Sequence, residues 1–597
     1  MPIMAFRCEP FQNLRFLNGF FMSMKPALSR SLKRRLSLCC LCLNTLILSW
    51  VGGCNTQTQQ DSTEATATDN QFSSITPDGD PAQNSDAATI PTARPSLPAQ
   101  TPAIPLGNTV IDPNAPWLTP TELPRETWDI MFLGQSKIGS MHTQVTPGEG
   151  NSKDLLRLKL ESLIRVNRGG QLTQQKIEVV SKEKPNGELV EFLATLWEGQ
   201  TKTEVTGTMF LDSLVIQSTQ SDGKSSKISI PWKAEYKGPF AVEQSLKQQR
   251  LKEGEIREYQ FLSIPLFRLA KLQLKGGKQE SVAMLDGSAA ELQEVTTTIF
   301  LDNNPVMESV SWVDAKGETL KSAALGLQIL TYRGNQSMAE SVGTSVQVDL
   351  LQVTSIALPK GTSNLHQLKS AKFQISAQKD PFKLFSTKTN QTIRSTAALD
   401  CEVTIHPVTP EFALPEGIQK PDIPTETDSA PTAMVQSDDP SIVAMAARCC
   451  GEETDPWKIA LALEKCVHDS IERKDFSKSF ASASEVAKEL RGDCTEHSVL
   501  LAALLRAKKI PARIASGLVY VETADGPMMG YHMWNEAYIG ERWIPLDAVL
   551  GQGGIGAGHL KILESSLPDQ NPYVALLPVL QVLGELKISS VTEEPVK

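Results

Sequence analysis

The chain lacks an excess of basic residues, and it lacks the common nucleotide- and calcium-binding motifs. Its 597 residues include 58 Lys and Arg against 68 Asp and Glu, which gives a formal net charge of −10. This acidic balance argues against a nucleic-acid partner. The sequence contains no serine nucleophile elbow, Walker loop or EF-hand loop, and the spacing of its cysteines does not match a zinc site. We therefore expect no nucleotide and no metal cofactor.

One glycine-rich stretch matches a nucleotide-binding motif by letter alone. Gly551–Gly556 reads GQGGIG, but a dinucleotide site needs this motif between a strand and a helix. Here the motif precedes an apparent strand at His559–Ile562. We interpret it as a flexible loop near the candidate site described below.

The first 54 residues have the pattern of an export signal. Five basic residues from Lys25 to Arg35 precede a stretch without charge from Leu36 to Gly53. The stretch ends in Val51-Gly52-Gly53-Cys54, which resembles a bacterial lipobox and implies that Cys54 is lipidated. An uncleaved membrane anchor is the alternative, since about 18 apolar residues can span a bilayer. Both interpretations predict an extracytoplasmic protein of the cell envelope that is anchored to a membrane.

Composition divides the remaining chain into four segments. Residues 55–122 are rich in small and polar residues and poor in large apolar ones, which predicts a flexible tether. Residues 123–406 consist of short alternating runs separated by turn residues, which predicts a largely antiparallel β region of one or two subdomains. Prolines and acidic residues dominate 407–438, an interdomain linker. Residues 439–597 combine predicted helices with strands and form an α+β domain.

Five cysteines lie after the tether: Cys401, Cys449, Cys450, Cys466 and Cys494. In an oxidising compartment Cys449 or Cys450 could pair with Cys466 or Cys401, which would leave Cys494 free. The alternative is a set of buried, unpaired thiols on helices, and the sequence leaves both possibilities open.

The candidate chemistry begins at Cys494, which follows the turn Arg491-Gly492-Asp493. Apolar residues after the cysteine recur at helical spacing and predict a helix that starts there. These residues are Val499, Leu500, Ala503, Leu504 and Ala507. The positive end of a helix favours a thiolate over a thiol. Thiolate chemistry also requires a base and a group that orients the base.

Two predicted strands supply candidates for these two roles. The strand 531–539 carries His532, a turn follows, and the strand 542–547 ends in Asp547. A tight hairpin places such strands side by side, so that His532 and Asp547 can meet across the pair. Trp534 lies on the same strand face as His532 and would shield an ion pair from water. Cys494, His532 and Asp547 therefore form a candidate set of nucleophile, base and orienting group.

These stretches resemble the transglutaminase-like superfamily, whose members have a papain-like cysteine fold. The resemblance implies a papain-like α+β fold at the C-terminus, with Cys494 as nucleophile, His532 as general base and acid and Asp547 as orienting group. Ala548 departs from the family, which usually has proline after the aspartate. The matching stretches are GDCTEH at 492–497, LLAALLRAKKIPARIASGLVY at 500–520, YHMWNEAYI at 531–539 and RWIPLDAV at 542–549.

The predicted β region carries little recognisable chemistry. Its histidines His142, His366 and His406 stand alone, and we interpret them as surface or hydrogen-bonded residues. The stretches at Trp128 and Trp312 resemble, respectively, an opening strand and a half-barrel sheet of bacterial envelope proteins with transglutaminase-like domains. We interpret this region as a scaffold, with substrate presentation as the alternative.

Three helices are predicted before Cys494. One begins after Asp439, one begins at Asp455-Pro456, and one spans Ser484–Leu490. Glu496 and His497 follow the candidate nucleophile on its own helix, and we interpret both as structural residues.

The resemblance implies attack of the Cys494 thiolate on a peptide-like amide, with a thioester intermediate. We expect backbone amides at the start of the Cys494 helix to stabilise the oxyanion. If water attacks the thioester, the protein is a cysteine peptidase or amidase. If an amine attacks it, the protein is a transamidase. We favour hydrolysis of a protein or peptide substrate, because water is plentiful outside the cell. The alternative is a non-catalytic binding or assembly protein with the same fold.

Overall fold

The computed structural model describes residues 123–168, 171–198, 201–220, 225–264, 266–324, 329–341, 355–378, 384–410, 422–471, 481–568 and 586–595. Residues 1–122 lie outside the described residues, and with them the predicted export signal, Cys54 and the tether. Within the described ranges, no helix is long and apolar enough to cross a membrane.

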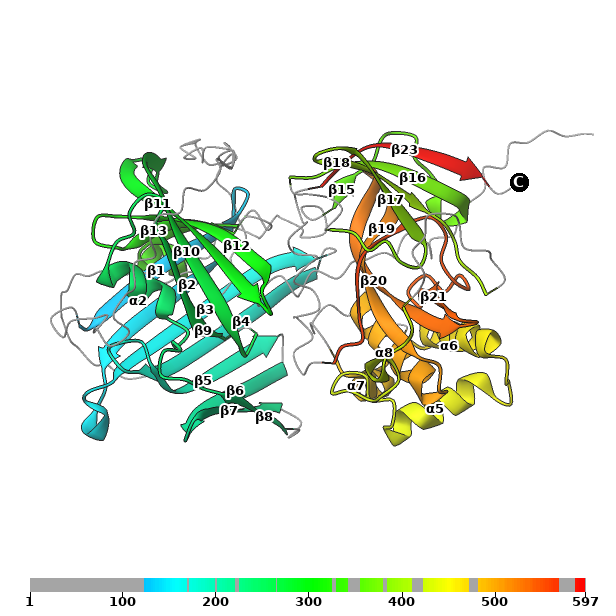
Figure 1. The fold of residues 1–597 in the computed structure, drawn as a ribbon, viewed down its shortest axis with the longest axis horizontal. Helices are drawn as coiled ribbons and strands as arrows, with labels where there is room; N and C mark the ends of the chain where they lie inside the picture. Colours follow the sequence, from blue (N-terminus) through cyan, green and yellow to red (C-terminus); the bar gives the residue numbers. More distant parts are fainter. Residues whose placement is uncertain are drawn as a thin grey trace, which may run out of the picture. The chain divides into compact units, whose positions relative to one another are not determined.

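One antiparallel sheet of 14 strands makes up the first part of the described chain (Figure 1). Its order is β8-β7-β6-β5-β4-β3-β2-β1-β14-β13-β12-β11-β10-β9, so neighbours in sequence are mostly neighbours in the sheet. The strands are β1 (Arg125–Leu133), β2 (Ser136–Pro147), β3 (Leu156–Arg168), β4 (Gln171–Glu183), β5 (Leu189–Glu198), β6 (Thr201–Phe210), β7 (Ser213–Gln220), β8 (Ser225–Pro231), β9 (Ile256–Ser263), β10 (Arg268–Ala283), β11 (Ala289–Leu301), β12 (Asn304–Val313), β13 (Thr319–Ala324) and β14 (Ile329–Gly334).

Alternation of apolar and polar residues explains this sheet. Leu158, Leu160 and Ile164 of β3 lie on one face, and Ile177 and Val179 of β4 lie beside them in the same core. Because side chains of a strand alternate between its two faces, one buried face requires such a pattern. Two short helices, α2 (Ala241–Gln248) and α3 (Gln336–Glu340), complete this part. The prediction of a large antiparallel β region is confirmed.

Two smaller sheets follow in the chain. The first has the order β15-β20-β19-β22, with β21 paired to β20, and the second has the order β17-β18-β16-β23. Their strands are β15 (Ile356–Ala357), β16 (Leu368–Ser376), β17 (Gln391–Ala397), β18 (Asp400–Ile405), β19 (Ala512–Thr523), β20 (Gly526–Ile539), β21 (Arg542–Leu546), β22 (His559–Ser565) and β23 (Lys587–Pro595).

Strands from both sides of the predicted linker share these two sheets. Ile356 of β15 lies opposite Met529 of β20, and Phe373 of β16 lies opposite Val591 of β23. The sheets of the C-terminal part therefore include strands that precede residue 407 in the sequence.

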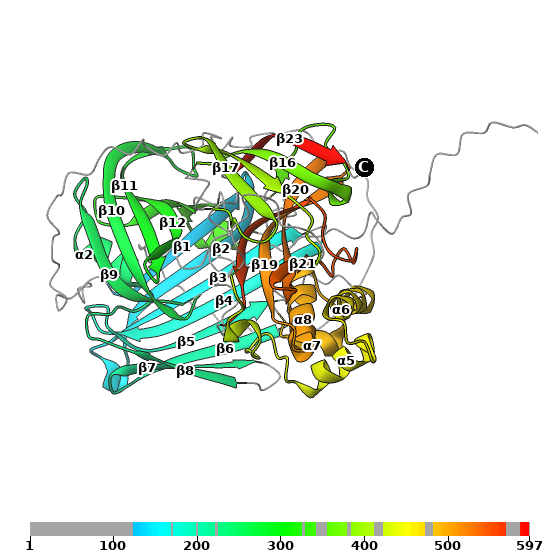
Figure 2. The same ribbon diagram turned by 45° about the vertical axis from the view of Figure 1, so that its right-hand side comes forward.

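Four helices pack together in the C-terminal part: α5 (Pro440–Cys450), α6 (Pro456–Ser470), α7 (Ala483–Glu489) and α8 (Cys494–Ala507). Asp439 and Asp455 cap α5 and α6, as predicted. Helix α8 is central, because α5, α6, α7, β19 and β20 all contact it (Figures 1 and 2). Every residue from Cys494 to Arg506 is buried.

A disulfide joins α5 to α6. Cys449 and Cys466 form the bond, while Cys401, Cys450 and Cys494 are buried cysteines that take no part in it. The structure thereby selects one of the pairings that the sequence left open, and the candidate nucleophile is not part of this disulfide.

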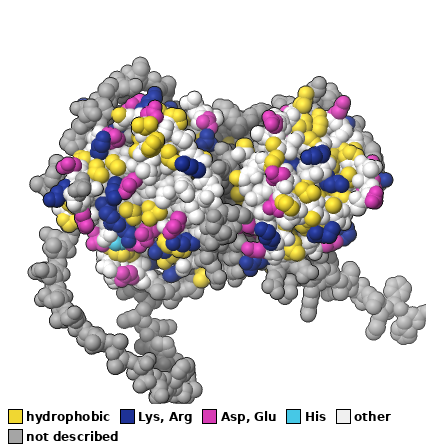
Figure 3. Space-filling model, turned by 90° about the horizontal axis from the view of Figure 1, so that it is seen from below, with side chains coloured by type: hydrophobic (Ala, Val, Ile, Leu, Met, Phe, Trp, Pro, Cys, Tyr) yellow, Lys and Arg dark blue, Asp and Glu magenta, His cyan; other side chains and the backbone are white. Residues whose placement is uncertain are grey.

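Acidic and basic side chains are interspersed over the described residues of the face drawn in Figure 3. On that face they form no extended field of one sign, which is the feature that attracts nucleic acid.

Candidate active site

Helix α8 begins at Cys494 because the residues around it form a local cap. The Asp493 carboxylate accepts a hydrogen bond from the Thr495 amide at 2.8 Å, and the Glu496 carboxylate accepts one from the Asp493 amide at 2.9 Å. This reciprocal arrangement is a capping box. Gly492 has a φ of +148°, and a Cβ there would lie 2.3 Å from the Glu496 side chain. The turn before the cysteine therefore requires glycine.

The same cap occupies the amides that we expected to stabilise an oxyanion. The Asp493 side chain accepts from the amides of Thr495 and Glu496, and the His497 amide donates to the Asp493 carbonyl at 3.1 Å. The expectation of an oxyanion site is thus wrong for the amides of Thr495, Glu496 and His497, which already donate hydrogen bonds at the helix start. The capping carboxylate of Asp493 also opposes the stabilisation of a thiolate by the helix N-terminus.

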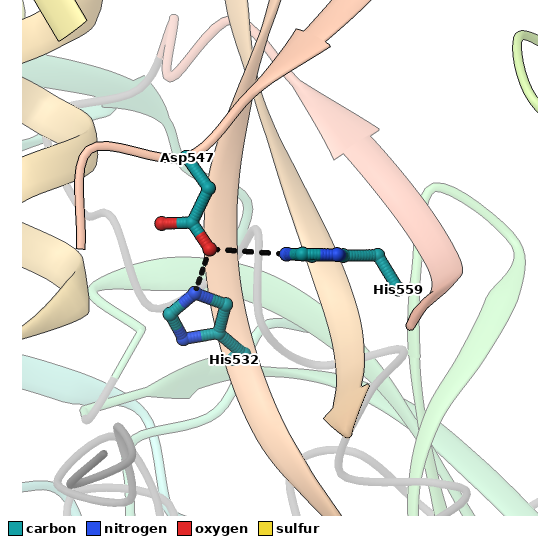
Figure 4. A group of neighbouring side chains, drawn as sticks. All are labelled: His532, Asp547 and His559. Atoms are coloured by element: carbon teal, nitrogen blue, oxygen red, sulfur yellow. Dashed lines mark hydrogen bonds and ion pairs between the residues drawn. The ribbon is translucent and has the colours of Figure 1, made fainter. Parts of the chain in front are cut away.

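His532 and Asp547 meet as the hairpin predicts. His532 lies on β20, Asp547 directly follows β21, and His532 Nε2 is 2.9 Å from Asp547 Oδ2 (Figure 4). Both residues are buried, at 1% and 0% exposure. Burial alone would raise the pKa of Asp547, but the charge of His532 and the hydrogen bonds from His532 and His559 hold it well below its ordinary value. Asp547 is therefore a carboxylate at neutral pH.

The bond through Nε2 decides which nitrogen of His532 remains for a nucleophile. Since Nε2 donates to Asp547, Nδ1 is the atom left to exchange a proton with a thiol. Helix α8 is tied to β20 close by, because Asn535 Nδ2 donates to the Ser498 carbonyl at 2.9 Å, one helical turn after Cys494. Cys494 itself is 1% exposed, so its thiol lies in a site from which bulk water is largely excluded.

His559 is a third member of this cluster that the sequence did not single out. It is the first residue of β22, and its Nε2 lies 3.0 Å from the same Asp547 Oδ2 that His532 contacts (Figure 4). The His532 and His559 ring centroids are 6.0 Å apart. The local signal was weak: one histidine after a glycine-rich loop at a strand start has no distinctive spacing.

Aromatic rings enclose the three side chains. The Trp534 ring stacks beside His532 at 6.2 Å, as its predicted position on the same face suggests, and meets the His559 ring edge-on at 5.0 Å. His366 lies 5.3 Å from the His559 ring, with its Nε2 2.9 Å from the Tyr520 carbonyl. Burial lowers the pKa of His366 to about 4. His366 is thus a hydrogen-bonded residue, as interpreted from the sequence, but it does not stand alone, because its ring lies beside that of His559.

Glu464 on α6 is a second residue that sequence reasoning missed. Its carboxylate accepts the Asp547 amide at 3.0 Å and the Gly554 amide at 3.1 and 3.2 Å. It thereby fastens the candidate orienting residue to the GQGGIG loop. Burial raises the pKa of Glu464 to about 7. The contact joins residues more than 80 positions apart, so no local pattern reveals it.

Glu496 and His497 contact main-chain groups. His497 Nδ1 lies 2.6 Å from the Asp493 carbonyl, and Glu496 Oε1 accepts the Ala481 amide at 3.1 Å. These contacts fit the interpretation of both as structural residues.

The cluster in Figure 4 also has the composition of a metal site. His532, Asp547 and His559 offer two nitrogens and one oxygen within 4.8 Å of one another, which are ligand types that suit zinc. The two hydrogen bonds to Asp547 already account for how these side chains lie.

Comparison with known proteins agrees with the resemblance read from the sequence. Residues 443–548 match the sequence profile of the Transglutaminase-like superfamily, a range that contains all three predicted site residues. The chain matches no curated protein.

Three solved structures are distantly similar to parts of the chain. The "Beta-barrel-like Protein of Domain of Unknown Function DUF1849" from Brucella abortus is 14% identical over 36% of this chain and 96% of its own, with a TM-score of 0.28. A "Putative Cysteine Protease" from Cytophaga hutchinsonii is 16% identical over 38% of this chain and 83% of its own, with a TM-score of 0.23. A "putative protease" from Parabacteroides distasonis is 9% identical over 59% of this chain and 64% of its own, with a TM-score of 0.15. Scores this low carry no argument about fold or activity. The profile match alone identifies residues 443–548 as a domain of the transglutaminase-like superfamily.

Proposed function

We propose that the protein is a cysteine enzyme that acts on peptide-like amide bonds through a thioester at Cys494. The observation that carries this proposal is the buried contact of 2.9 Å between His532 Nε2 and Asp547 Oδ2. It fixes the imidazole so that Nδ1 remains for the thiol, in a segment that matches the superfamily. The cysteine, the base and the orienting carboxylate are the minimum set for nucleophilic catalysis.

In the first proposed step, the Cys494 thiolate forms a bond to the amide carbonyl carbon, and the carbonyl π electrons move to the oxygen. The carbon–nitrogen bond then breaks as the electrons return, and the His532 imidazolium gives its Nδ1 proton to the leaving amine. A thioester and a neutral imidazole remain.

In the second proposed step, His532 removes a proton from an acceptor, which attacks the thioester carbon. The Cys494 thiolate leaves, and the ion pair with His532 is restored. Water as acceptor gives a carboxylic acid, and a primary amine gives a new amide. We favour water, since no residue described above marks an amine site. A protein or peptide is the proposed substrate class.

We also propose that the enzyme is exported and anchored to a membrane, through lipid at Cys54 or through an uncleaved N-terminal helix. The disulfide between Cys449 and Cys466 supports an oxidising compartment.

The test uses the full-length protein, a peptide library and a biotinylated primary amine. Cleaved peptides with new carboxyl ends would indicate hydrolysis, and biotinylated peptides would indicate transamidation. Cys494→Ala should abolish both products while the melting temperature stays near that of the wild type. Cys401→Ala, which removes another buried cysteine side chain outside the disulfide, is the matched control and should retain activity. Turnover by Cys494→Ala would contradict the proposed mechanism.

The near-complete burial of Cys494 favours one alternative, a binding protein that does not turn over. Peptide-resolved alkylation by iodoacetamide separates the two. An ion pair would keep Cys494 reactive well below pH ~8.5, the ordinary thiol value, and His532→Ala would remove this reactivity. Cys450 is an internal reference, since burial raises the pKa of its thiol. If alkylation of Cys494 follows the ordinary thiol pKa in both the wild type and His532→Ala, the result would favour the binding protein.

A further inference from the structure

We propose that His559 is a positioning residue, which holds the Asp547 carboxylate in the orientation that lets His532 present Nδ1 to Cys494. The inference rests on the function proposed above and extends its site beyond the segment that matches the superfamily, which ends at residue 548. Its basis is a shared acceptor: Asp547 Oδ2 lies 2.9 Å from His532 Nε2 and 3.0 Å from His559 Nε2 (Figure 4).

The chemistry of the cluster determines which ring nitrogens carry protons. A carboxylate only accepts hydrogen bonds, so both imidazoles must carry a proton on Nε2. Burial lowers the pKa of His559, against the opposing effect of Asp547, which favours the neutral ring at neutral pH, and the contact with Asp547 places its single proton on Nε2. Its Nδ1 is buried and has no partner among the described residues. His559 thus supplies a hydrogen bond without a charge, and His532 remains the ring that becomes positive beside the thiol.

His559 completes the set of hydrogen-bond donors around the Asp547 carboxylate. Oδ1 accepts the Val549 amide at 2.8 Å and the Leu550 amide at 3.3 Å, while Oδ2 accepts the two imidazoles. With four donors around its two oxygens, the carboxylate cannot rotate without breaking a charge-assisted hydrogen bond. Without His559, Oδ2 would be buried with one of its hydrogen-bond donors missing. The Asp547 carboxylate could then rotate and carry His532 away from its position.

The fold brings the two histidines to Asp547 from different strands. Asp547 follows β21, which pairs with β20, whereas His559 begins β22, which pairs with the opposite edge of β19. His559 is 0% exposed. A Cβ at Gly558 would lie 2.7 Å from His366 Nδ1, so the close packing before β22 requires glycine. Among the described residues, the titratable groups that act on His559 are Asp547, His532 and the neutral His366.

Space filling alone does not explain a histidine at this position. An apolar side chain would fill the same volume without the cost of burying a polar ring. The arrangement therefore indicates selection of the Nε2 donor, and the test is a matched pair of variants. In His559→Gln the side-chain nitrogen can replace Nε2 as donor, whereas His559→Met has similar length and no donor. His366→Met changes a neighbouring ring that does not contact Asp547 and serves as the packing control.

The experiment measures kcat and KM on a peptide substrate and the rate of Cys494 alkylation at pH 6, all with the full-length protein. We expect His559→Met to lower both kcat and the alkylation rate roughly ten- to hundredfold, which is the effect of one hydrogen bond to a charged group. KM should stay unchanged. His559→Gln should recover most of both rates, and His366→Met should stay within about threefold of the wild type, since it removes no hydrogen bond to the carboxylate.

The outcomes separate this inference from the proposed function. A folded His559→Met variant with the wild-type kcat and alkylation profile overturns the role of His559, while an inactive Cys494→Ala variant still supports the enzyme. Equal loss in the Gln and Met variants also overturns it, because the donor then makes no difference. If His559→Met does not fold, nitrogen-15 NMR of the wild type decides: a protonated Nδ1 on His559 excludes the assigned hydrogen bond. An ordinary thiol titration of wild-type Cys494 refutes the proposed function itself, and with it the inference.

Discussion

Asp547→Asn is the most informative single change, because it alters one atom and leaves the shape intact. The amides of Val549 and Leu550 are fixed donors to Oδ1, so the amide oxygen of asparagine must take that position. Its NH2 group then faces the two imidazoles, and its two protons point at the two Nε2 atoms. Each histidine must accept there and move its own proton to Nδ1. His532 would present an N–H to Cys494 and could no longer act as a base.

The size of the effect follows from the contact distance. At 2.9 Å and an effective dielectric constant of about 20, a unit charge pair is worth about 6 kcal/mol. This energy corresponds to about four powers of ten in rate, and the same replacement in a serine-protease triad costs about 10⁴-fold. The number of hydrogen bonds around residue 547 does not change. We therefore expect the free energy of unfolding to change by no more than about 1–2 kcal/mol.

The assay is kcat for a peptide substrate at pH 7, with thermal unfolding measured on the same samples. Asp428→Asn is the control: Asp428 is a buried aspartate that accepts from Thr425 and Ser566, so the same chemical change is made where no imidazole is bound. It should leave kcat within about threefold of the wild type. If Asp547→Asn keeps more than about a tenth of the wild-type kcat, the tautomer argument is refuted.

Three further predictions concern the helix start, the β region and the disulfide. Asp493→Asn keeps an acceptor for the α8 cap but removes a charge beside the thiol, so the alkylation profile of Cys494 should shift to lower pH; a shift to higher pH would contradict this. Burial raises the pKa of Glu183 to about 8, so between about pH 4.5 and 8 the folded state keeps a proton that the unfolded state has lost, and stability falls as pH rises. Glu183→Gln should remove this dependence and stabilise the protein at pH 9 by on the order of 3–5 kcal/mol, measured by urea unfolding; an unchanged pH profile would count against a buried proton. Replacing Cys449 and Cys466 by alanine opens a loop of sequence separation 17 and should cost about 3 kcal/mol, and equal stability with and without reductant would exclude a contribution from the bond.

A C-terminal fragment would be a poor test of any of these changes. Arg513 is paired with Asp422 at 2.9 Å as well as with Glu536 at 2.8 Å, and the Gln391 side chain exchanges hydrogen bonds with the main chain of Lys561. A fragment that starts at residue 439 would lose Asp422 and Gln391 and leave buried polar groups without partners.

The sequence alone was sufficient where the contacts are local. The start of α8 depends on Asp493 and Glu496, three residues apart, which form a capping box at the N-terminus of this apolar helix. The contact between His532 and Asp547, which are 15 positions apart in the sequence, depends on a hairpin whose turn sets the register of its strands. These short-range rules placed the candidate base beside its orienting group before any tertiary structure was known.

Only the tertiary structure decided how this pair is supported. His559 reaches Asp547 because β22 pairs with β19, Glu464 reaches it because α6 packs beside the same loop, and His366 arrives from a segment 154 residues before its partner Tyr520. Strand pairing and helix packing over such separations depend on the whole buried core, since each contact must offset the entropy of closing a long loop. A local pattern can specify a cap or a hairpin, but it contains no information about which distant side chain completes a buried carboxylate.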